Sequence, residues 1–570
     1  MLKFRFRAVQ FSLCLLFLAV LTRLGYLQLW CHAELTRKAE HQFERTIQQA
    51  PRRGPVLDRE GRVLTDSVRV ASCYADPSIL RRPEKIAKTL AGPLQMPASS
   101  IVEKVRKASG SFVWLKRFIP IEQAQAIEEL NLYGIGVKWE YKRAYPNGDL
   151  ASHLLGFVGM EGQGLSGVEL VANDWLVDTR PPRHAMRDGR GTGVSDSPVE
   201  DDGNDRTWVK LSLDRTIQFI AERELEWGMA RSRSKHGLIV VQDPWTGEVL
   251  AVASRPKLTM GSDARVDPEQ LLIPAFHWVF EPGSTMKAIT TSAAIEENVV
   301  KPSDLLNCEN GHWKYQSMTI HDHEKDGVMS FAQVIERSSN IGTAKVGLRL
   351  GKTKLYDYFR AFGIGSRSGS EMPGESGGLL KPLNKWSGVS LPVMSFGQEV
   401  GVTAIQLAAA YSAIANGGML LEPRIFQEMV NEKGEHRTWQ TPSPVRRVVS
   451  KETTETVKKI LEGVVLRGTG KPAQLDGWSV AGKTGTAQKI DPKTHQYSPS
   501  RFIASFCGFV PVKKPRLTIV VVYDEPQGVS YGGYNAGPVF RNVAWHALTY
   551  MGVPSDVAPE VKVASAKKLP

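Results

Sequence analysis

An apolar run near the N-terminus divides the chain into two very unequal parts. The run covers residues 11–21, and the fifteen residues between Arg7 and Arg23 carry no charge. A membrane-spanning helix needs about 20 apolar residues. If Arg23 reaches toward the far headgroups, residues 8–30 supply that length, and Tyr26 and Trp30 fall where interfacial aromatic residues belong. The pattern therefore predicts one membrane-spanning segment at the start of the chain.

A cleaved signal peptide is the alternative, because its apolar core has a similar length. Arg23 and the bulky residues up to Trp30 leave no small-x-small cleavage site. We therefore interpret residues 1–30 as a cytoplasmic stub followed by an uncleaved signal anchor. The cations before the span place the short end in the cytoplasm; they are Lys3, Arg5 and Arg7. The bulk of the chain is then expected outside the cytoplasm, where no ATP is present.

The composition is that of a globular protein with more than one domain. Its 570 residues exceed the roughly 250–300 residues at which a single core stops growing. Hydrophobic residues make up 42% and charged residues 23% of the chain, which excludes wholesale disorder and collagen-like folds. The net charge of +13 suits an anionic partner, although a basic protein need not have one. Five cysteines without a CxxC pair exclude a disulfide scaffold and argue against a structural zinc site.

Changes in residue pattern divide the part beyond the anchor into two domains. Residues 31–207 mix short strand-like and helix-like stretches, and they end in a polar segment, residues 177–207, that is rich in Gly, Pro and Asp. Such a composition is typical of a linker or an exposed arm. Residues 208–552 have the pattern of one large α+β domain, and residues 553–570 are expected to form a C-terminal tail.

Periodicity predicts the main elements of both domains. In the smaller domain, helices are expected at residues 99–108 and 121–131. In the larger domain, the expected elements are a hairpin of residues 237–242 and 248–254, helices after Ser284 and at residues 403–415, central strands at residues 501–510 and 517–523, and a last helix that opens at Pro538.

Three motifs suggest phosphate or metal binding but lack the context that such sites need. Residues 162–167 match GxGxxG without a clear strand-to-helix crossover, and the lone pattern is weak. Residues 477–484 match GxxxxGK[ST], but no apolar strand precedes them and a poor helix follows, so a P-loop is not expected. The alternating His321-Asp322-His323 lies in a polar segment and is interpreted as solvated rather than as a metal site.

One Ser-x-x-Lys motif has the context of an activated nucleophile. The pattern occurs four times, but only Ser284 and Lys287 open an apolar helix. At positions i and i+3 the hydroxyl and the amine share one helix face, and the helix N-terminus stabilises negative charge at the serine. A desolvated lysine beside another cation has a lowered pKa and can act as a base.

Two further motifs follow in the order that penicillin-recognising serine acyltransferases require. Ser338-Ser339-Asn340 is an SxN motif, and Lys483-Thr484-Gly485-Thr486 is a KTG motif that precedes a strand-like run. Each motif alone arises often by chance. The ordered triplet SxxK, SxN and KTG is a specific signature of acyl transfer through a serine.

With these residues in place, the chain resembles the class B penicillin-binding proteins, and most closely the septal, FtsI-type D,D-transpeptidases. The resemblance covers nearly the whole chain. It includes, outside the triplet, residues 53–61 (RGPVLDREG), 143–146 (RAYP), 156–159 (GFVG), 164–169 (GLSGVE), 372–375 (MPGE) and 395–398 (SFGQ). The family implies a penicillin-binding, β-lactamase-like transpeptidase domain, in which helices flank an antiparallel sheet, on an elongated dimerisation-like pedestal with one transmembrane helix. Residues 31–207 correspond to the pedestal and residues 208–552 to the transpeptidase domain.

The resemblance also implies roles for the motif residues. Ser284 would attack the D-Ala-D-Ala bond of a stem peptide, Lys287 would take its proton, and Ser338 would relay a proton to the leaving amine. Asn340 would bind the substrate backbone, and Lys483 would tune Ser338. Thr484 and Thr486, with Lys483, would bind the terminal carboxylate of the donor. Gly485 would let the substrate strand lie close, and the amides of Ser284 and Thr486 would form an oxyanion hole.

Several alternatives to a septal transpeptidase stay open at this stage. An elongation-type transpeptidase, a D,D-carboxypeptidase and a β-lactam sensor share the triplet, whereas the ExxLN element of class A β-lactamases does not occur. The family implies no cofactor, metal or nucleic acid. The implied partners are stem peptides, β-lactams, the membrane, a SEDS-family glycosyltransferase and divisome proteins. The implied location is the bacterial inner membrane, with the catalytic domain in the periplasm.

Overall fold

The computed structural model describes residues 2–30, 52–177, 207–258, 268–491, 493–494 and 496–557. Beyond the N-terminal helix, these residues form two compact units. The first includes residues 69–141, and the second includes residues 52–68, 142–177 and 207–557. Two stretches of the predicted pedestal are thus grouped with the predicted transpeptidase domain. Most of the predicted linker and tail lies outside the described residues, so the domain limits stay predictions.

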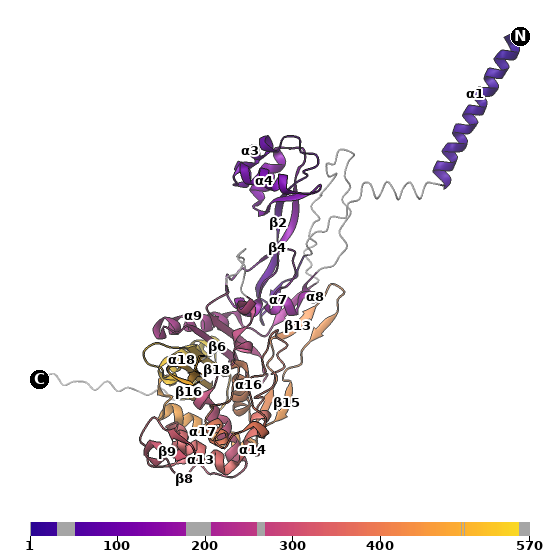
Figure 1. The fold of residues 1–570 in the computed structure, drawn as a ribbon. Helices are drawn as coiled ribbons and strands as arrows, with labels where there is room; N and C mark the ends of the chain where they lie inside the picture. The colour runs from indigo at the N-terminus through magenta and orange to yellow at the C-terminus, as the bar shows by residue number, and fades with distance from the viewer. Residues whose placement is uncertain are drawn as a thin grey trace. The chain divides into compact units, whose positions relative to one another are not determined.

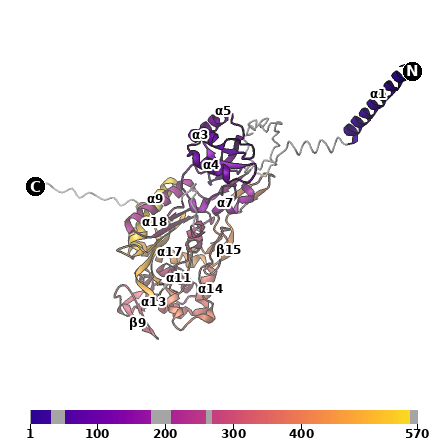
Figure 2. The same ribbon diagram turned by 45° about the horizontal axis from the view of Figure 1, so that its top comes forward.

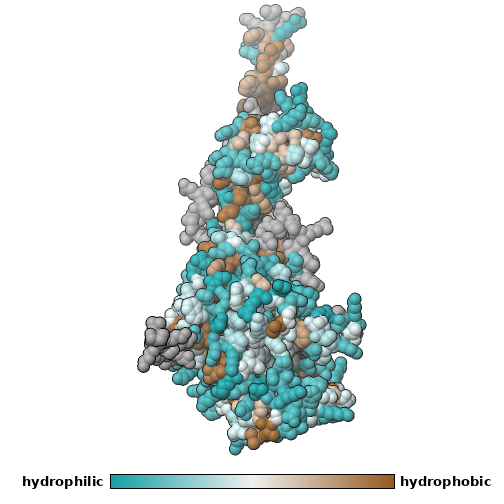
Figure 3. Space-filling view, turned by 90° about the vertical axis from the view of Figure 1, so that its left-hand side faces the viewer, coloured by the Kyte–Doolittle hydropathy of each residue, from teal (hydrophilic) through white to brown (hydrophobic). Residues whose placement is uncertain are grey.

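The N-terminal segment is helical over its whole described length. Helix α1 (Leu2–Gly25) continues into a π-helical turn, η1 (Tyr26–Trp30). Residues Phe4–Trp30 are the one helical stretch in the described part of the chain that is long and apolar enough to cross a membrane. Its apolar side chains are exposed in the structure (Figure 3). Arg23 lies over the ring of Tyr26 at 5.4 Å, near the end of the stretch.

The first unit packs three helices against antiparallel strands. Strand β3 (Val113–Ile119) and strand β4 (Ile135–Ala144) both pair with β2 (Val63–Ala75). The helices are α3 (Pro83–Leu94), α4 (Ala98–Lys107) and α5 (Ile121–Glu129). Their apolar faces bury Leu90, Ile101 and Ile127 with Leu115 of β3. The two predicted helices are confirmed as α4 and α5, with ends that differ by one or two residues.

A second set of strands lies in the second unit and includes the first part of β2, residues 63–68. Its order is β14-β13-β5-β1-β2, and only the β1–β5 pair is parallel in this series. The other strands and the nearby short helices are β1 (Val56–Leu57), β5 (Trp208–Leu211), β13 (Phe426–Val430), β14 (His436–Thr438), α6 (Ser152–Leu155), α7 (Gly167–Val171) and α8 (Asn173–Leu176).

A buried charge cluster ties these segments together. The Glu169 carboxylate accepts hydrogen bonds from Arg53 Nη2 at 2.8 Å and from Arg143 Nε at 2.7 Å. At most 4% of any of the three side chains is exposed. Thr65 Oγ1 donates a further bond to Glu169 at 3.1 Å. Arg53, Arg143 and Glu169 come from the RGPVLDREG, RAYP and GLSGVE motifs, and Thr65 comes from strand β2. The three motifs therefore share one structural role.

The main sheet of the second unit is antiparallel, with five strands in the order β16-β17-β18-β6-β7. The strands are β6 (His236–Gln242), β7 (Val249–Arg255), β16 (Ala481–Ile490), β17 (Tyr497–Val510) and β18 (Leu517–Asp524). Successive side chains of a strand face opposite sides of a sheet. Val520 and Val522 join one core cluster, whereas Ile519 and Val521 join the other. The sheet is therefore buried on both faces, which explains its near-continuous apolar strands.

Helices cover the two faces of this sheet. Helices α9 (Arg215–Ser232) and α18 (Gly532–Tyr550) lie side by side and contribute to one cluster (Figures 1 and 2). Helix α16 (Ala404–Ala415) contributes to the cluster on the other face. Thr403 and Gln406 form a capping box at the start of α16, as expected for a threonine three residues before a glutamine. The predicted α+β fold, with helices flanking an antiparallel sheet, is confirmed.

The rest of this domain is mainly helical and carries the first two motifs. Its helices are η2 (Pro268–Leu271), α10 (Pro274–His277), η3 (Gly283–Met286), α11 (Lys287–Glu296), η4 (Glu309–Gly311), α12 (Phe331–Glu336), α13 (Asn340–Leu350), α14 (Lys352–Ala361), η5 (Leu383–Lys385), α15 (Ser390–Ser395), α17 (Lys451–Leu466) and η6 (Lys471–Ala473). Its short strands are β8 (Leu305–Asn307), β9 (His312–Tyr315), β10 (Met318–His321), β11 (Val328–Ser330), β12 (Met419–Leu421) and β15 (Pro444–Arg447).

The last helix differs from the prediction at its start. Helix α18 begins at Gly532, so Pro538 lies inside it rather than at its first turn. The two glycines at positions 532 and 533 disfavour a helix by propensity. A β-carbon at Gly532 would meet the carbonyl oxygens of Gly485 and Ser505. Close packing of the first turn against β16 and β17 therefore outweighs local propensity. The predicted hairpin, the two central strands and the helix at residues 403–415 are confirmed.

Candidate active site

The SxxK motif sits where a short 3-10 turn passes into helix α11. Ser284 is partly exposed in the 3-10 turn η3, and the fully buried Lys287 is the first residue of α11. Two hydrogen bonds brace the turn. Thr285 Oγ1 donates to the Pro282 carbonyl at 2.9 Å, and Tyr411 Oη of α16 donates to the Thr285 carbonyl at 2.8 Å. The nucleophile candidate is therefore held by the core of the domain.

Ser338 is the hub of the site. Its Oγ donates to Ser284 Oγ at 3.0 Å and accepts from Lys483 Nζ at 2.8 Å and from Lys287 Nζ at 3.3 Å. Lys287 Nζ also donates to the Ser338 carbonyl at 2.6 Å and to Asn340 Oδ1 at 2.8 Å. The structure thus brings together all five residues predicted as catalytic. The hydroxyl of Ser284 is linked to both lysines through Ser338.

Burial makes both lysines weak bases for their type. The pKa of Lys287 is lowered to about 7 by burial, which the negative charge of Asp322 partly opposes. The pKa of Lys483 is lowered well below its ordinary value, first by burial and then by the charge of Lys287. A lysine whose pKa lies near neutrality exchanges protons readily at physiological pH.

The contacts of Lys287 suit a neutral amine. Its two shortest hydrogen bonds, to the Ser338 carbonyl and to Asn340 Oδ1, use the two N–H groups of a neutral amine. The lone pair of neutral Lys287 can then face Ser338 Oγ at 3.3 Å, provided that the Ser338 hydroxyl turns its single proton from Ser284 Oγ to Lys287 Nζ. Asn340 is fixed in turn, because its Nδ2 donates to the His321 carbonyl at 2.9 Å.

The KTG motif forms part of strand β16 at the edge of the sheet. Lys483 and Thr484 are buried, and Thr484 Oγ1 lies 2.8 Å from Thr469 Oγ1 and 3.4 Å from Lys483 Nζ. Thr486 is partly exposed, and its Oγ1 accepts a hydrogen bond from the Gly532 amide at 3.1 Å. Two hydroxyls and an amine are therefore fixed along one short stretch of strand.

Gly485 has a packing role in the fold, beside the substrate role that stays a prediction. A β-carbon at this position would meet Ser505 Oγ, the Pro282 carbonyl at 2.8 Å and Thr285 Cγ2 at 3.0 Å. All three atoms belong to the protein, on β17 and around the nucleophile turn. The glycine therefore lets β16 approach the turn that carries Ser284, whatever it does for a substrate.

The edge position of β16 suits a peptide ligand. In the sheet, β16 pairs with β17 alone, so its other edge has backbone N–H and C=O groups free of strand pairing. An extended peptide can add to such an edge by main-chain hydrogen bonds.

Two of the motifs that suggest phosphate or metal binding can be compared with the geometry of the described residues. The last four residues of the GxxxxGK[ST] match, residues 481–484, open strand β16, and no helix follows this strand directly, so the match does not have the geometry of a P-loop. Within the described residues, no group of three or more His, Cys, Asp or Glu side chains is placed to hold a metal ion.

Three contributors escaped prediction from the sequence. Thr469 contacts the KTG threonine, Tyr411 braces the nucleophile turn, and Asp322 accepts hydrogen bonds at the SxN motif. Thr469 and Tyr411 lie far from the motifs in sequence, and no spacing rule points to them. The interpretation of the His321-Asp322-His323 segment as solvated is wrong for Asp322, whose partly buried carboxylate accepts hydrogen bonds from the protein. The signal that the sequence offers for Asp322 is its place directly after residues 318–321, where apolar and polar residues alternate as in a strand.

Comparisons with known proteins match both domains. The chain matches the family model of the penicillin binding protein transpeptidase domain over residues 237–544 and that of the penicillin-binding protein dimerisation domain over residues 48–183. Stage V sporulation protein D of Bacillus subtilis is 35% identical over 551 residues, which cover 95% of this chain and 84% of that protein. Peptidoglycan D,D-transpeptidase FtsI of Escherichia coli K12 is 31% identical over 549 residues, covering 94% of this chain and 90% of the relative.

Solved structures resemble this chain at the level of the fold as well. The crystal structure of penicillin binding protein 3 from Mycobacterium tuberculosis complexed with aztreonam has a TM-score of 0.69 and 28% sequence identity, over 90% of this chain and 98% of that chain. A peptidoglycan synthetase from Bifidobacterium adolescentis has a TM-score of 0.68 and 25% identity, over 90% and 97% of the two chains.

Proposed function

The chain belongs to the class B penicillin-binding proteins, and on that basis we propose that it is a septal peptidoglycan D,D-transpeptidase whose nucleophile is Ser284. The observation that carries the proposal is the hydrogen-bonded group of Ser284, Ser338, Lys287 and Lys483, in which two lysines of lowered pKa share one serine hydroxyl. Such a group supplies a nucleophile and a base without a histidine.

In the proposed first step, Ser284 Oγ bonds to the carbonyl carbon of the penultimate D-Ala. The serine proton passes to neutral Lys287, directly or through Ser338. The carbonyl oxygen becomes an oxyanion, which the amides of Ser284 and Thr486 would stabilise. When the tetrahedral intermediate collapses, the bond to the terminal D-Ala breaks. Its nitrogen takes a proton through Ser338, and an acyl ester remains on Ser284.

In the proposed second step, an amine from a neighbouring stem peptide attacks the ester. A new peptide bond forms, and Ser284 regains its proton.

Lys483, Thr484 and Thr486 would bind the carboxylate of the donor before the first step, because they place an amine and two hydroxyls along β16. Asn340 would hold the peptide backbone from the opposite side of the site.

We further propose that β-lactams inhibit this chain by acylating Ser284. Support comes from the similar Mycobacterium tuberculosis structures, whose descriptions name complexes with aztreonam and ampicillin. A penicillin such as ampicillin presents an amide carbonyl and a carboxylate, as the D-Ala-D-Ala end also does, and aztreonam carries a sulfonate anion in place of that carboxylate. The same residues would therefore receive both.

Intact mass spectrometry tests the nucleophile assignment. The wild-type chain and the Ser284→Ala variant are incubated with penicillin, and the Thr285→Ser variant serves as a control at the neighbouring buried hydroxyl. One stable adduct is expected on the wild type and on Thr285→Ser, and none on Ser284→Ala. An unmodified wild type with intact drug would refute the assignment. Drug consumed without an adduct would indicate rapid deacylation, and with it a β-lactamase rather than a transpeptidase.

A second assay separates transpeptidation from hydrolysis. The acyl-enzyme is formed from a thioester analogue of D-Ala-D-Ala, and a D-amino acid is added as acceptor. A transpeptidase is expected to yield the aminolysis product in proportion to the acceptor concentration. Release of free acid alone, whatever the acceptor concentration, would favour the carboxypeptidase alternative.

The septal role rests on the similarity to FtsI of Escherichia coli over 94% of this chain. A SEDS-family glycosyltransferase in the same membrane is the proposed partner, contacting the anchor and the pedestal, with the catalytic domain in the periplasm. Depletion in the native cell is expected to give filaments with blocked septa. Rounded cells would instead indicate the elongation role. Co-purification of the glycosyltransferase in detergent, lost when residues 1–30 are exchanged for an unrelated span, tests the partner.

A further inference from the structure

Asp322 is the one side chain of the His321-Asp322-His323 motif that points into the protein's hydrogen-bond network at the site. It follows β10 and is partly buried, whereas His321 and His323 are exposed. Its carboxylate accepts hydrogen bonds from Ser339 Oγ at 2.5 Å, from the Asn340 amide at 2.5 Å and from the Ile341 amide at 3.0 Å. Three successive residues of the SxN segment are thus attached to one carboxylate.

The segment that Asp322 holds is strained. Ser338 has a φ of +66°, in the left-handed region that residues with a β-carbon seldom adopt. Such a conformation persists only where the surroundings fix it. The Asn340 side chain adds a fourth link, because its Nδ2 donates to the His321 carbonyl. Residues 321 and 322 therefore fix both the backbone and a side chain of the turn after Ser338.

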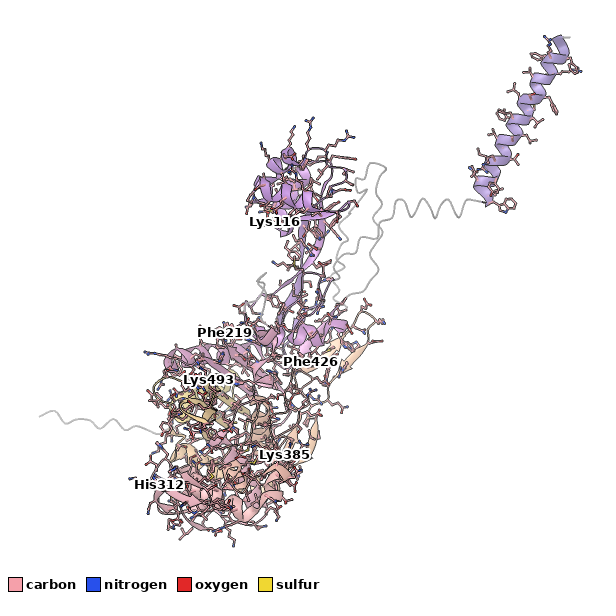
Figure 4. All side chains as sticks on the ribbon, viewed as in Figure 1. Lys116, Phe219, His312, Lys385, Phe426 and Lys493 are labelled. Carbon is pink, nitrogen blue, oxygen red and sulfur yellow. The ribbon has the colours of Figure 1, made fainter. Side chains whose placement is uncertain are left out.

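Asp322 is itself anchored to the hairpin of β9 and β10. Its amide donates to the Gly311 carbonyl at 3.0 Å, and Ile320, two residues earlier, is buried in the core. The hairpin carries His312, which Figure 4 labels, opposite His321 in the register of the two strands. The carboxylate is therefore a fixed support rather than a mobile surface group.

We propose that Asp322 is a positioning residue of this active site, whose carboxylate clamps residues 339–341 so that Ser338 and Asn340 stay against Lys287 and Ser284. The inference rests on the proposed function, because it assumes that Ser284 is acylated. The clamp is also an N-terminal cap of α13, an eleven-residue helix, whose first amides favour a negative charge.

The carboxylate charge has a second consequence at Lys287. Asp322 raises the pKa of Lys287 against the effect of burial. The other titratable groups that face this pair are Lys483 on β16 and Cys308 before η4, while His323, Glu324 and Asp326 lie on the same loop as Asp322. Removal of the Asp322 charge disfavours the ammonium form, so the pKa of Lys287 falls further.

The test measures acylation of the full chain in detergent by a fluorescent penicillin between pH 5 and pH 9. The variants are Asp322→Ala, which removes the clamp, and Asp322→Asn, which keeps an acceptor for the two amides but removes the charge. Glu324→Gln is the matched control, because it removes a charge from an exposed side chain of the same loop. Thermal unfolding of each variant verifies that it is folded.

We expect Asp322→Ala to acylate about a hundredfold more slowly at pH 9, where Lys287 is mainly neutral in both proteins, the cost of misplacing catalytic groups by about 1 Å. Asp322→Asn is expected to recover part of this rate. The acid limb of its pH–rate profile, where the rate falls because Lys287 becomes protonated, is expected to shift to lower pH by about one unit. Glu324→Gln should match the wild type. A merely structural role would lower stability without moving the acid limb.

Two results would overturn the inference. One is an Asp322→Ala variant that acylates within about twofold of the wild type. The other is an Asp322→Asn variant whose acylation rate and acid limb both equal those of the wild type. This second result remains decisive if Asp322→Ala fails to fold. Absence of acylation in the wild type itself would instead refute the proposed function, so the two failures are distinguishable.

Discussion

Lys287 and Lys483 are both fully buried, and both donate to the hydroxyl of Ser338. Two ammonium groups cannot share one small buried site without strong repulsion. At least one of them is therefore neutral at physiological pH, and a neutral amine beside the Ser338–Ser284 pair is a ready base. Lys483 is held mainly by Ser338, whereas Lys287 also contacts Asn340 and the Ser338 carbonyl. The two lysines thus differ in the contacts that hold them.

Replacement of Lys287 by arginine is expected to abolish the base while keeping a cation. Arginine stays protonated in proteins, so the rate of acylation by penicillin should fall by about 10²–10⁴-fold, the usual contribution of a general base.

In the wild type, the pKa of Lys287 near 7 predicts an acid limb: the rate falls as the pH drops through about 7, because the amine becomes protonated. Stopped-flow acylation from pH 5 to pH 9 measures both effects.

A nearby carboxyl provides the control for that assignment. Burial raises the pKa of Glu281 to about 7, and Glu281 lies three residues before Ser284. Its Oε1 accepts hydrogen bonds from the Glu399 amide and from Tyr497 Oη, each at 3.0 Å. The Glu281→Gln variant should keep the acid limb. If the limb disappears in Glu281→Gln and survives in Lys287→Arg, the carboxyl and not the lysine sets the pH dependence.

At the scale of elements, the site depends on how closely strand β16 approaches the nucleophile turn. A Gly485→Ala substitution places a methyl group against Ser505 Oγ, the Pro282 carbonyl and Thr285. We expect it to lower the free energy of unfolding by about 1–3 kcal/mol, as overpacking does. We also expect acylation to slow by about a hundredfold, because β16 moves away from Ser284. Chemical denaturation and the penicillin assay measure the two losses.

The matched control for that substitution is Gly92→Ala. Gly92 lies in α3, and a β-carbon there meets no atom within 4 Å. The helix propensity of alanine favours this variant, whereas Pro93, the next residue, disfavours a helical residue with a β-carbon before it, so the variant should change stability by less than about 1 kcal/mol and stay fully active. A Gly485→Ala variant that behaved like Gly92→Ala would show that the approach of β16 does not depend on the missing side chain.

The buried Arg53–Glu169–Arg143 cluster makes a second prediction about elements. The Glu169→Gln substitution leaves two buried guanidinium groups without their anion, which typically costs about 3–5 kcal/mol. The exposed i,i+4 pair of Glu103 and Lys107 is the contrast, since Glu103→Gln should change stability little. Differential scanning calorimetry compares the two. Equal melting temperatures for both variants would mean that the cluster is not a structural support.

Individual elements could be predicted from the sequence because their signals are local. The apolar runs of β6, β7, β17 and β18 and the capping box of α16 lie within short windows. The start of α18 could not be predicted, because two glycines are tolerated there only through packing against β16 and β17. The five catalytic candidates were found from an ordered triplet. Their convergence on Ser338, and the clamp by Asp322, arise from contacts between residues up to 145 positions apart.

At the scale of the whole molecule, the acylation site and the apolar N-terminal helix are separable parts. All residues of the site belong to the second compact unit, whereas the candidate membrane span, Phe4–Trp30, contributes no described residue to it. Loss of residues 1–30 should therefore change where the protein resides without changing its chemistry. The helix is expected to stay in the mature protein, because Arg23 and the bulky residues after it offer no cleavage site.

The prediction is that the full chain sediments with membranes and resists carbonate extraction, while residues 31–570 remain in the supernatant. Both should form the penicillin adduct at the same rate within about twofold, since solvent rather than lipid surrounds the catalytic domain in either case. Added protease should degrade that domain in spheroplasts, because three cations before the span hold the short end in the cytoplasm. The mass of the membrane-bound chain decides between an uncleaved anchor and a cleaved signal peptide. A mature protein that began near residue 31 would identify a signal peptide, and the chain would then need another means of staying at the membrane.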